Sequence, residues 1–324
     1  MSSSAIVRVK GPFDLALSLA AQARFHGSPP PVAAKLAAAV TVAGIPTLIE
    51  IAAIDRAASS ARPSLRITSS RVVPRRPLVR LARRLVAADL DLRPFYRSAS
   101  RQPVLAAVVR ALRGLKPLPP ASLFEMAIVA ITEQQLSMVA AFRIRSRLVD
   151  RFGASVAGRR MFPTPSRLAA ASIGALRACG LSRRKAEYVR ALAARVAAGT
   201  LDLEALRAQT GSQAAAALVR ERGFGDWSAQ YFLGRGLTRT DCLPAADIGL
   251  RRAVGRFLGR GRSLTPARLE RVLSPFRPYR GLAAFYLAVY ARLGNGDGRS
   301  EAVGAAFGGG RGQTGNQRRA AHGE

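Results

Sequence analysis

An aspartate and a glycine-flanked turn are the residues of this sequence whose types and spacing could do chemistry. The turn, Gly223-Phe224-Gly225, lies within residues 218–229 (LVRERGFGDWSA) and joins two helical patterns. Glycines allow positive φ and close backbone approach, and the first N–H groups of the second helix can bind a phosphate oxygen. The segment predicts a helical hairpin that contacts a phosphate, although most such turns only connect helices.

Asp247 comes eighteen residues after Ala229 and begins a helical pattern with Leu250, Val254 and Phe257 on one face. Asp is a preferred helix N-cap, so a purely structural role is one interpretation. The positive end of the helix dipole also favours an ionised carboxylate, which a general base or a cation stabiliser requires. Position in the sequence leaves both interpretations open.

The rare histidines and cysteines exclude several classes of active site. The sequence contains two histidines, His26 in an expected Gly/Pro-rich turn and His322 near the end. Histidines at these positions are not expected to form a Ser-His-Asp triad or a two-histidine zinc site. Cys179 and Cys242 are too few for a four-thiolate zinc or iron–sulfur site. Scarce cysteines and the absence of a signal-like apolar run predict a cytoplasmic protein without a membrane segment.

The charge of the chain indicates an anionic partner. Its 324 residues include 51 Lys or Arg and 19 Asp or Glu, for a net charge of +32, and +25 of this lies in residues 76–295. Coding bias can inflate the total, since only four of the basic residues are lysines. The concentration of positive charge in residues 76–295 indicates that the partner-facing surface lies in this part of the chain.

Hydrophobic patterning predicts a mostly α-helical protein with a small α+β N-terminal domain. Residues 1–75 combine β-like runs at 5–10 and 65–73 with a helix that Asp14 would cap. From Pro77 onward the periodicity is helical, so we expect a helical body over 76–293 and a disordered tail over 294–324. Helices are expected at 77–88, 103–113, 121–151, 165–179, 182–198, 211–222, 226–236, 247–259, 264–275 and 280–292.

Taken together, the hairpin and the aspartate resemble the helix-hairpin-helix DNA glycosylase superfamily, and in detail its AlkA-type 3-methyladenine DNA glycosylase branch. The resemblance covers nearly all of residues 10–292 and implies a helix-hairpin-helix glycosylase fold that excises alkylated purines from duplex DNA in base excision repair. It is carried by the hairpin and by the segments GPFDLALSL, LDLRPFY, LFEMAIVAITEQQLS, FPTPSRLAAA, LSRRKAEYV, LPAADIGLRR and LTPARL.

The resemblance implies that Asp247 is the essential carboxylate and that the damaged base is flipped into a pocket beside it. Trp227 stands where strand-cleaving members carry a lysine, and since it cannot form a Schiff base we expect a monofunctional glycosylase. Trp227 and Tyr231 share a helix face and are implied as pocket aromatics, unless they are core residues. Tyr286 is a weaker pocket candidate, as is Tyr279, and Ala288 replaces an aromatic of some relatives.

The resemblance also implies DNA contacts. Gln135 keeps the phase of an apolar helical stripe, so it is either a buried residue or part of a break at 133–135. The resemblance favours the break, with Gln135 as the minor-groove wedge, whereas some AlkA relatives carry an apolar wedge. Glu221 departs from the apolar residue usual before the hairpin. The expected DNA contacts are Gln134, Gln135, Gly223, Phe224, Gly225, Ser228, Arg251 and Arg252, with Arg183, Arg184, Lys185, Arg256, Arg260 and Arg262 as further basic residues.

Two alternative functions stay open. One is a glycosylase for an oxidised or deaminated base, and the other is a catalytically silent helix-hairpin-helix DNA-binding protein that would not need Asp247. If the chain is a DNA glycosylase, we expect it to be a nucleoid-associated monomer. We expect it to have no metal or organic cofactor and no iron–sulfur cluster. A monovalent cation could help the hairpin bind phosphate.

Overall fold

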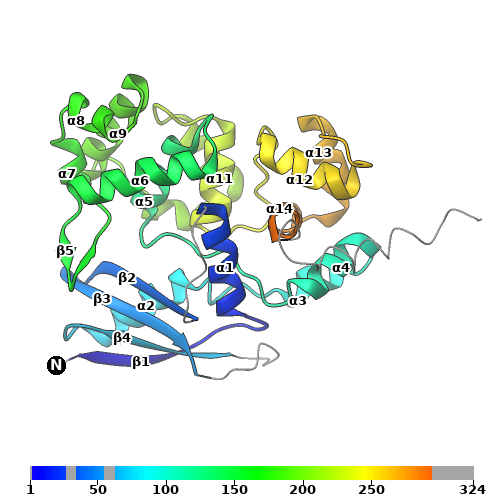
Figure 1. The fold of residues 1–324 in the computed structure, drawn as a ribbon, viewed down its shortest axis with the longest axis horizontal. Coiled ribbons are helices and arrows are strands. Elements are labelled where there is room, and N and C mark those ends of the chain that lie inside the picture. Colours follow the sequence, from blue (N-terminus) through cyan, green and yellow to red (C-terminus); the bar gives the residue numbers. More distant parts are fainter. Residues whose placement is uncertain (1, 27–33, 55–62, 294–324) are drawn as a thin grey trace, which may run out of the picture.

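The computed structural model describes residues 2–26, 34–54 and 63–293, which form a small sheet beside a larger helical body (Figure 1). This confirms the predicted mostly helical fold with a small N-terminal sheet. The expected disordered tail lies outside the described residues. The antiparallel sheet has the strand order β1-β4-β3-β2, formed by β1 (Ser3–Arg8), β2 (Lys35–Val42), β3 (Ile45–Ala53) and β4 (Ser64–Ser69).

One face of the sheet is buried by two helices, α1 (Leu15–His26) and α2 (Arg75–Leu85). Alternate strand residues such as Ile49, Ile51 and Ile67 are fully buried, as period-two alternation requires. Asp14 caps α1 as expected, since its Oδ1 accepts a hydrogen bond from the Leu17 N–H at 2.9 Å. The core beneath the sheet includes α2 and so continues past residue 75.

The strands β2 and β3 lie outside the β-like runs at 5–10 and 65–73 that the sequence predicts. These strands form a hairpin whose turn residues, Ala43 and Gly44, have φ of +49° and +81°. Such turns are usually recognised by Asn-Gly or Asp-Gly. The turn here carries alanine instead, and β2 contains a run of alanines, which are depleted in strands.

The helical body contains short helices that mostly begin at a serine or threonine. Ser122, Ser137, Ser182 and Thr265, for example, each accept a hydrogen bond from the backbone N–H three residues ahead. The helices are α3 (Arg93–Ala99), α4 (Pro103–Ala111), α5 (Leu123–Glu133), α6 (Met138–Phe152), α7 (Pro165–Ala169), α8 (Ile173–Ala178), α9 (Arg183–Ala197), α10 (Gly211–Val219), α11 (Asp226–Gly236), α12 (Ile248–Leu258), α13 (Pro266–Leu273) and α14 (Arg280–Leu293).

Local capping corrects two helix predictions. The helix expected over 121–151 is divided into α5 and α6, because Ser137 begins a new helix. The helix expected over 165–179 is divided by Ser172, which caps α8. The sequence analysis did not expect α3, and His26 ends α1 rather than lying in a turn.

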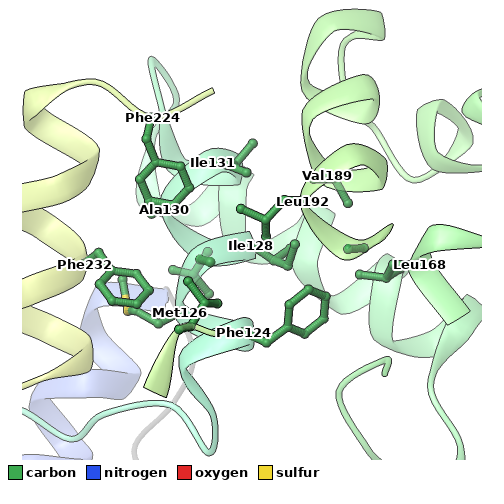
Figure 2. Close-up of a cluster of buried hydrophobic side chains, with 14 of the residues drawn as sticks. Phe124, Met126, Ile128, Ala130, Ile131, Leu168, Val189, Leu192, Phe224 and Phe232 are labelled. Atoms are coloured by element: carbon green, nitrogen blue, oxygen red, sulfur yellow. The ribbon is translucent and has the colours of Figure 1, made fainter. Parts of the chain in front are cut away.

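Two hydrophobic cores hold the body together. The first surrounds α5, where Phe124, Ile128 and Phe232 pack among side chains of α9 and α11 (Figure 2). The second surrounds α14, with α3, α4, α12 and α13 packed around it. The side chains of α11 on one core therefore face those of α12 and α14 on the other.

Candidate active site

Asp247 is held by two hydrogen bonds, one to each carboxylate oxygen. Its Oδ1 accepts from the Leu250 N–H at 2.7 Å, which makes Asp247 the N-cap of α12. Its Oδ2 accepts from Trp227 Nε1 at 3.1 Å. The cap interpretation is therefore correct but incomplete, since a side chain from another helix orients the same carboxylate.

Trp227 and Tyr231 form an aromatic platform next to this carboxylate. The two residues lie one turn apart on α11, and their rings stack with centroids 5.1 Å apart and an interplanar angle of 14°. Both are half-buried and line the cavity described below, so neither is an ordinary core residue. Burial, with the neighbouring Glu133 carboxylate, raises the pKa of Tyr231 well above its usual value, so the hydroxyl stays protonated.

A cavity of about 580 Å³ lies between the two cores and contains Asp247 in its wall. This volume is within the range of small-molecule sites. Its floor and walls combine aromatic, apolar and charged side chains from helices far apart in the sequence. They include Phe25 of α1, Glu133 of α5, Trp227 and Tyr231 of α11, Leu250 and Arg252 of α12, and Phe285, Ala288 and Arg292 of α14.

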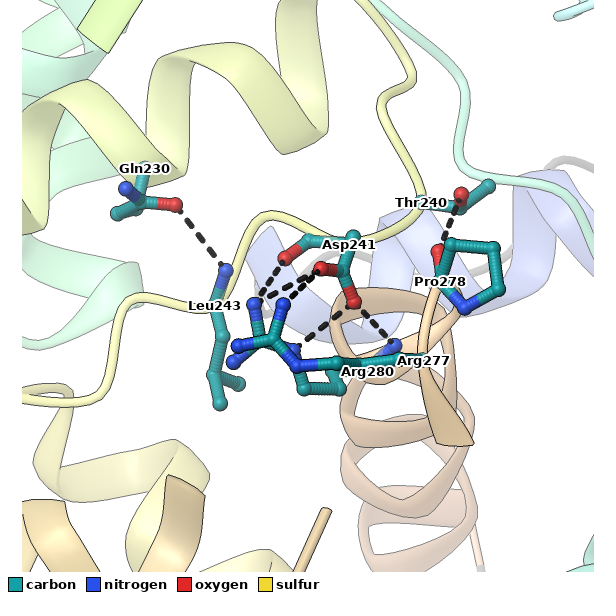
Figure 3. A network of polar contacts seen from close by, with 7 residues as sticks. All are labelled: Gln230, Thr240, Asp241, Leu243, Arg277, Pro278 and Arg280. Carbon is teal, nitrogen blue, oxygen red and sulfur yellow. Dashed lines mark hydrogen bonds and ion pairs between the residues drawn. The ribbon is translucent and has the colours of Figure 1, made fainter. Parts of the chain in front are cut away.

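The loop between α11 and α12, which leads to Asp247, is fixed by a polar network (Figure 3). Asp241 accepts hydrogen bonds from Arg280 Nε at 2.9 Å and Nη2 at 2.8 Å, and it also pairs with Arg277 Nη1 at 3.2 Å. The Thr240 hydroxyl donates to the Pro278 carbonyl at 2.8 Å. These contacts attach the loop to the start of α14 and so limit the movement of Asp247.

The predicted hairpin is present, and only one of its glycines is required by the backbone. Gly223 has φ of +97°, and a Cβ on it would lie 2.7 Å from the Tyr188 ring. Gly225 has an extended φ of −119° and open space around it. Gly225 is the N-cap of α11, so the first N–H groups of that helix are available to an anion.

Phe224 and Ser228 do not offer their side chains to DNA. Phe224 is 7% exposed, packs against Phe232, and donates its N–H to the Glu221 carbonyl at 2.9 Å. Ser228 is 2% exposed, and its Oγ accepts from Gln134 Nε2 at 2.8 Å. Because the hairpin packs both side chains inward, the expected DNA contact of these two residues can involve only their backbone groups.

The break after α5 is where the resemblance implied it. Gln135 is exposed with φ of +55°, and Leu136 beside it is 42% exposed. Gln134, in contrast, faces the hairpin, and its Nε2 donates to the Gly223 carbonyl at 2.7 Å. Lys185 Nζ donates to the carbonyls of Thr132 and Gln134, so it caps α5 instead of projecting toward a partner.

Arg251 and Arg252, expected together as DNA contacts, differ in their surroundings. Arg251 is half-buried, and its Nη1 donates to the Leu264 carbonyl at 3.2 Å. Arg252 is exposed and lies at the cavity. Glu221, the departure before the hairpin, is accommodated by an ion pair with Arg195. Of the two arginines, Arg252 is therefore the one placed to meet a partner.

Tyr286 is a core residue and does not line the cavity, so its prediction as a pocket aromatic is wrong. It is fully buried, and its hydroxyl hydrogen-bonds the Leu115 carbonyl at 2.7 Å and Tyr96 Oη at 3.0 Å. Tyr279 likewise packs against Phe95. Apolar residues occur on both sides of α14. Its sequence therefore does not indicate which side faces the core and which side faces the cavity.

Sequence reasoning missed several residues that reach the cavity. Phe25 of α1 lies stacked on Phe285 of α14, with ring centroids 6.4 Å apart, and the Arg292 guanidinium lies 4.3 Å from the Phe25 centroid. Burial lowers the pKa of Arg292, while the Asp247 carboxylate opposes this effect. Glu133 was considered only as part of the helix break. These residues are distant in sequence, so only the tertiary contacts join them.

The described residues contain neither a membrane-spanning helix nor a cluster of metal-ligating side chains. No described helix has the length and apolar character needed to cross a membrane. Within residues 2–26, 34–54 and 63–293, no group of three or more His, Cys, Asp or Glu side chains is placed to hold a metal ion.

Comparison with known proteins shows which family this site resembles. Residues 128–278 match the model of the HhH-GPD superfamily base excision DNA repair proteins, a region that includes Glu133, the hairpin and Asp247. The chain is 29% identical over 203 residues to the DNA-3-methyladenine glycosylase of Bacillus subtilis, which covers 61% of this chain and 67% of that protein. It is 31% identical to the DNA-3-methyladenine glycosylase 2 of Escherichia coli over 173 residues, which cover 51% of this chain and 56% of that protein.

Solved structures agree on the fold. The 3-methyladenine DNA-glycosylase of Archaeoglobus fulgidus superposes with a TM-score of 0.76 over 90% of this chain and 100% of that one, at 23% identity. The Schizosaccharomyces pombe 3-methyladenine DNA glycosylase in complex with abasic DNA superposes with a TM-score of 0.56 at 25% identity. The superposition covers 63% of this chain and 99% of that one. Together with the hairpin and the capped Asp247, these similarities show that the chain resembles the HhH-GPD superfamily of base excision DNA repair proteins over residues 128–278, and in particular its AlkA-type members.

Proposed function

We infer that this chain is a DNA N-glycosylase that excises N-alkylated purines of the 3-methyladenine type in base excision repair. The observation that carries the inference is the Asp247 carboxylate, oriented by Trp227 Nε1 and the Leu250 N–H at the wall of an aromatic cavity. The similarity to named DNA-3-methyladenine glycosylases supports this substrate class over an oxidised or deaminated base.

The reaction follows from the charges of the base and the carboxylate. A flipped base lies against the Trp227–Tyr231 platform, whose electron-rich rings favour a cation. N-alkylation makes the purine cationic, so the bond from C1′ to the base breaks with its electron pair going to the base, which leaves neutral. Asp247 stabilises the positive charge on the sugar, and water adds to C1′ with loss of a proton.

The product of this reaction is an intact strand with an abasic site. Trp227 offers an indole N–H, already bonded to Asp247, and no amine that could form a Schiff base with the sugar. The proposed hydrolysis uses only water, so we expect no resident cofactor, and a monovalent cation would act only at the hairpin. EDTA should therefore leave the rate of base release unchanged.

Duplex DNA is the proposed partner, bound by a monomer at the nucleoid. The hairpin offers N–H groups of α11 to a backbone phosphate, and we expect the exposed Gln135, at the break after α5, to fill the space left by the extruded base. Exposed arginines such as Arg252 add sequence-independent affinity for phosphates.

One assay separates this function from a silent DNA-binding protein. Methylated duplex DNA is incubated with the wild type, with Asp247→Asn, and with Asp150→Asn, which changes an exposed carboxylate on α6 outside the cavity. Base release should be lost with Asp247→Asn and kept with Asp150→Asn. DNA binding without release by the wild type would favour the silent protein, and strand cleavage at the rate of release would contradict a monofunctional enzyme.

A further inference from the structure

A second carboxyl group lies in the wall of the cavity. Glu133 is the last residue of α5, and only 6% of its surface is exposed. Its Oε1 lies 3.7 Å from Arg145 Nη1, whereas its Oε2 is buried and forms no hydrogen bond with any described residue. Buried polar atoms in folded proteins are nearly always hydrogen-bonded. Glu133 thus lies in the wall of the proposed base pocket and has an acceptor oxygen that no described residue satisfies.

Three features of the fold disfavour a carboxylate at this position. Burial raises the pKa of Glu133, and the Asp247 carboxylate acts in the same direction, whereas the Tyr231 hydroxyl and the guanidinium groups of Arg145 and Arg235 offset only part of the effect. The C-terminal end of α5 also carries the negative end of the helix dipole. A neutral glutamine of similar shape would avoid all three effects.

Arg145 is not a dedicated partner that would explain the carboxylate. Its Nη2 hydrogen-bonds His26 Nε2 at 3.1 Å, and its guanidinium lies 5.1 Å from the centroid of the Phe142 ring. The 3.7 Å contact with Glu133 is longer than a hydrogen bond. Arg145 therefore has structural contacts of its own besides its ion pair with Glu133.

The aromatic platform relates Glu133 to Asp247. Trp227 donates to Asp247, and Tyr231, four residues further along α11, lines the cavity beside Glu133. Four residues advance a helix by about 6 Å, which is close to the length of a purine. The platform therefore has one carboxyl group near each end.

We propose that Glu133 reads the edge of the extruded base that points away from the sugar, and that it accepts hydrogen bonds from N–H donors of cationic N-alkylated purines. This inference rests on the proposed function, because it places the sugar at Asp247. Adenine offers its N6 amine, and guanine offers N1–H and its N2 amine. A carboxylate accepts such bonds with both oxygens, and the positive charge of the base offsets its buried negative charge.

The test compares two modified bases in single-turnover excision from duplex DNA. One duplex contains 7-methylguanine, which has N–H donors on this edge, and the other contains 1,N6-ethenoadenine, whose fused ring removes them. We expect Glu133→Gln to slow 7-methylguanine release about tenfold or more, the loss of a charge-assisted hydrogen bond, and to slow ethenoadenine release less than about threefold. The ratio of the two rates is the quantity that the inference predicts.

The control is Glu125→Gln on the same helix. Burial raises the pKa of Glu125 as well, and its Oε2 accepts from the Ala121 N–H at 3.2 Å, but it lies outside this cavity. Glu125→Gln should leave the ratio of rates unchanged. Arg145→Gln should also leave the ratio of rates unchanged. If Arg145→Gln instead changed this ratio as much as Glu133→Gln does, Glu133 would act only by holding Arg145.

Binding to DNA with a stable abasic-site analogue separates base recognition from folding. That duplex has no base to read, so Glu133→Gln should bind it within about twofold of the wild type. Equal slowing of both modified bases by Glu133→Gln, or no slowing, would overturn the inference while leaving the proposed function intact. Failure of the wild type to release either base would overturn both.

Discussion

The indole of Trp227 donates a hydrogen bond to Asp247 Oδ2 at 3.1 Å, and this contact joins the helix after the hairpin to the helix that Asp247 caps. One side chain thereby contributes a stacking surface and orients the carboxylate. A glycosylase that binds its base on this platform therefore couples base stacking to the position of the reacting sugar.

Trp227→Phe separates these two contributions. The substitution keeps an aromatic ring against Tyr231 and removes the donor to Asp247. A hydrogen bond to a charged group contributes about 1.5–3 kcal/mol, so we expect the single-turnover rate to fall about 10- to 100-fold. The melting temperature should stay within about 3 °C of the wild type. A wild-type rate would show that Asp247 needs no help from the indole.

The two hairpin glycines provide a matched pair. Gly223→Ala forces a side chain at positive φ against Tyr188, so it should destabilise the fold by about 1–3 kcal/mol and weaken DNA binding. Gly225→Ala meets open space at an extended φ and should change stability by less than about 0.5 kcal/mol. Denaturant unfolding measures both. Equal effects would mean that the hairpin relaxes around Gly223.

Gln134 and Gln135 are adjacent but should differ in their effects. Gln135→Ala should slow excision from duplex DNA several-fold more than excision from single strands, because only a duplex leaves a gap in the stack. Gln134→Ala removes the hydrogen bonds to Gly223 and Ser228 and should slow both substrates alike, with a loss of about 1–3 kcal/mol in stability. Excision assays on paired and unpaired oligonucleotides decide the matter. Parallel losses for Gln135→Ala would make it a structural residue.

Lys116 predicts a pH dependence of stability. It is 1% exposed, its Nζ donates to the carbonyls of Lys10 and Ala87, and burial lowers its pKa to about 7. Between pH 7 and 10.5 the unfolded chain binds a proton that the folded chain releases, so this group's contribution to stability rises with pH.

Comparison with Lys116→Met isolates this contribution, because other titrating groups are shared and the lost hydrogen bonds are independent of pH. From pH 7 to 9 the wild type should gain about 2–3 kcal/mol of unfolding free energy relative to the variant. Urea titrations at each pH provide the measurement. A constant difference would show that the buried ammonium keeps its ordinary affinity for protons.

The helical body could be predicted from the sequence because its signals are local. Hydrophobic patterns of period 3.6 and serine or threonine caps involve residues close in sequence. The same is true of the turn after Leu218 and of the cap at Asp247. The break at 133–135 was expected only from the family resemblance, because Gln135 keeps the phase of the apolar stripe. The hairpin of β2 and β3 was missed because its alanine-rich strand and Ala-Gly turn carry weak local signals.

Tertiary packing alone decided which residues reach the cavity. Tyr286 and Ala288 are two residues apart on α14, yet the tyrosine is core and the alanine lines the cavity, since helix rotation is set by contacts with α3 and α4. Phe25 and Glu133 join Asp247 only because α1 and α5 pack against α11 and α14 from distant parts of the chain. The sequence thus determined the local chemistry of Asp247 and the hairpin, whereas long-range packing determined the composition of the pocket around them.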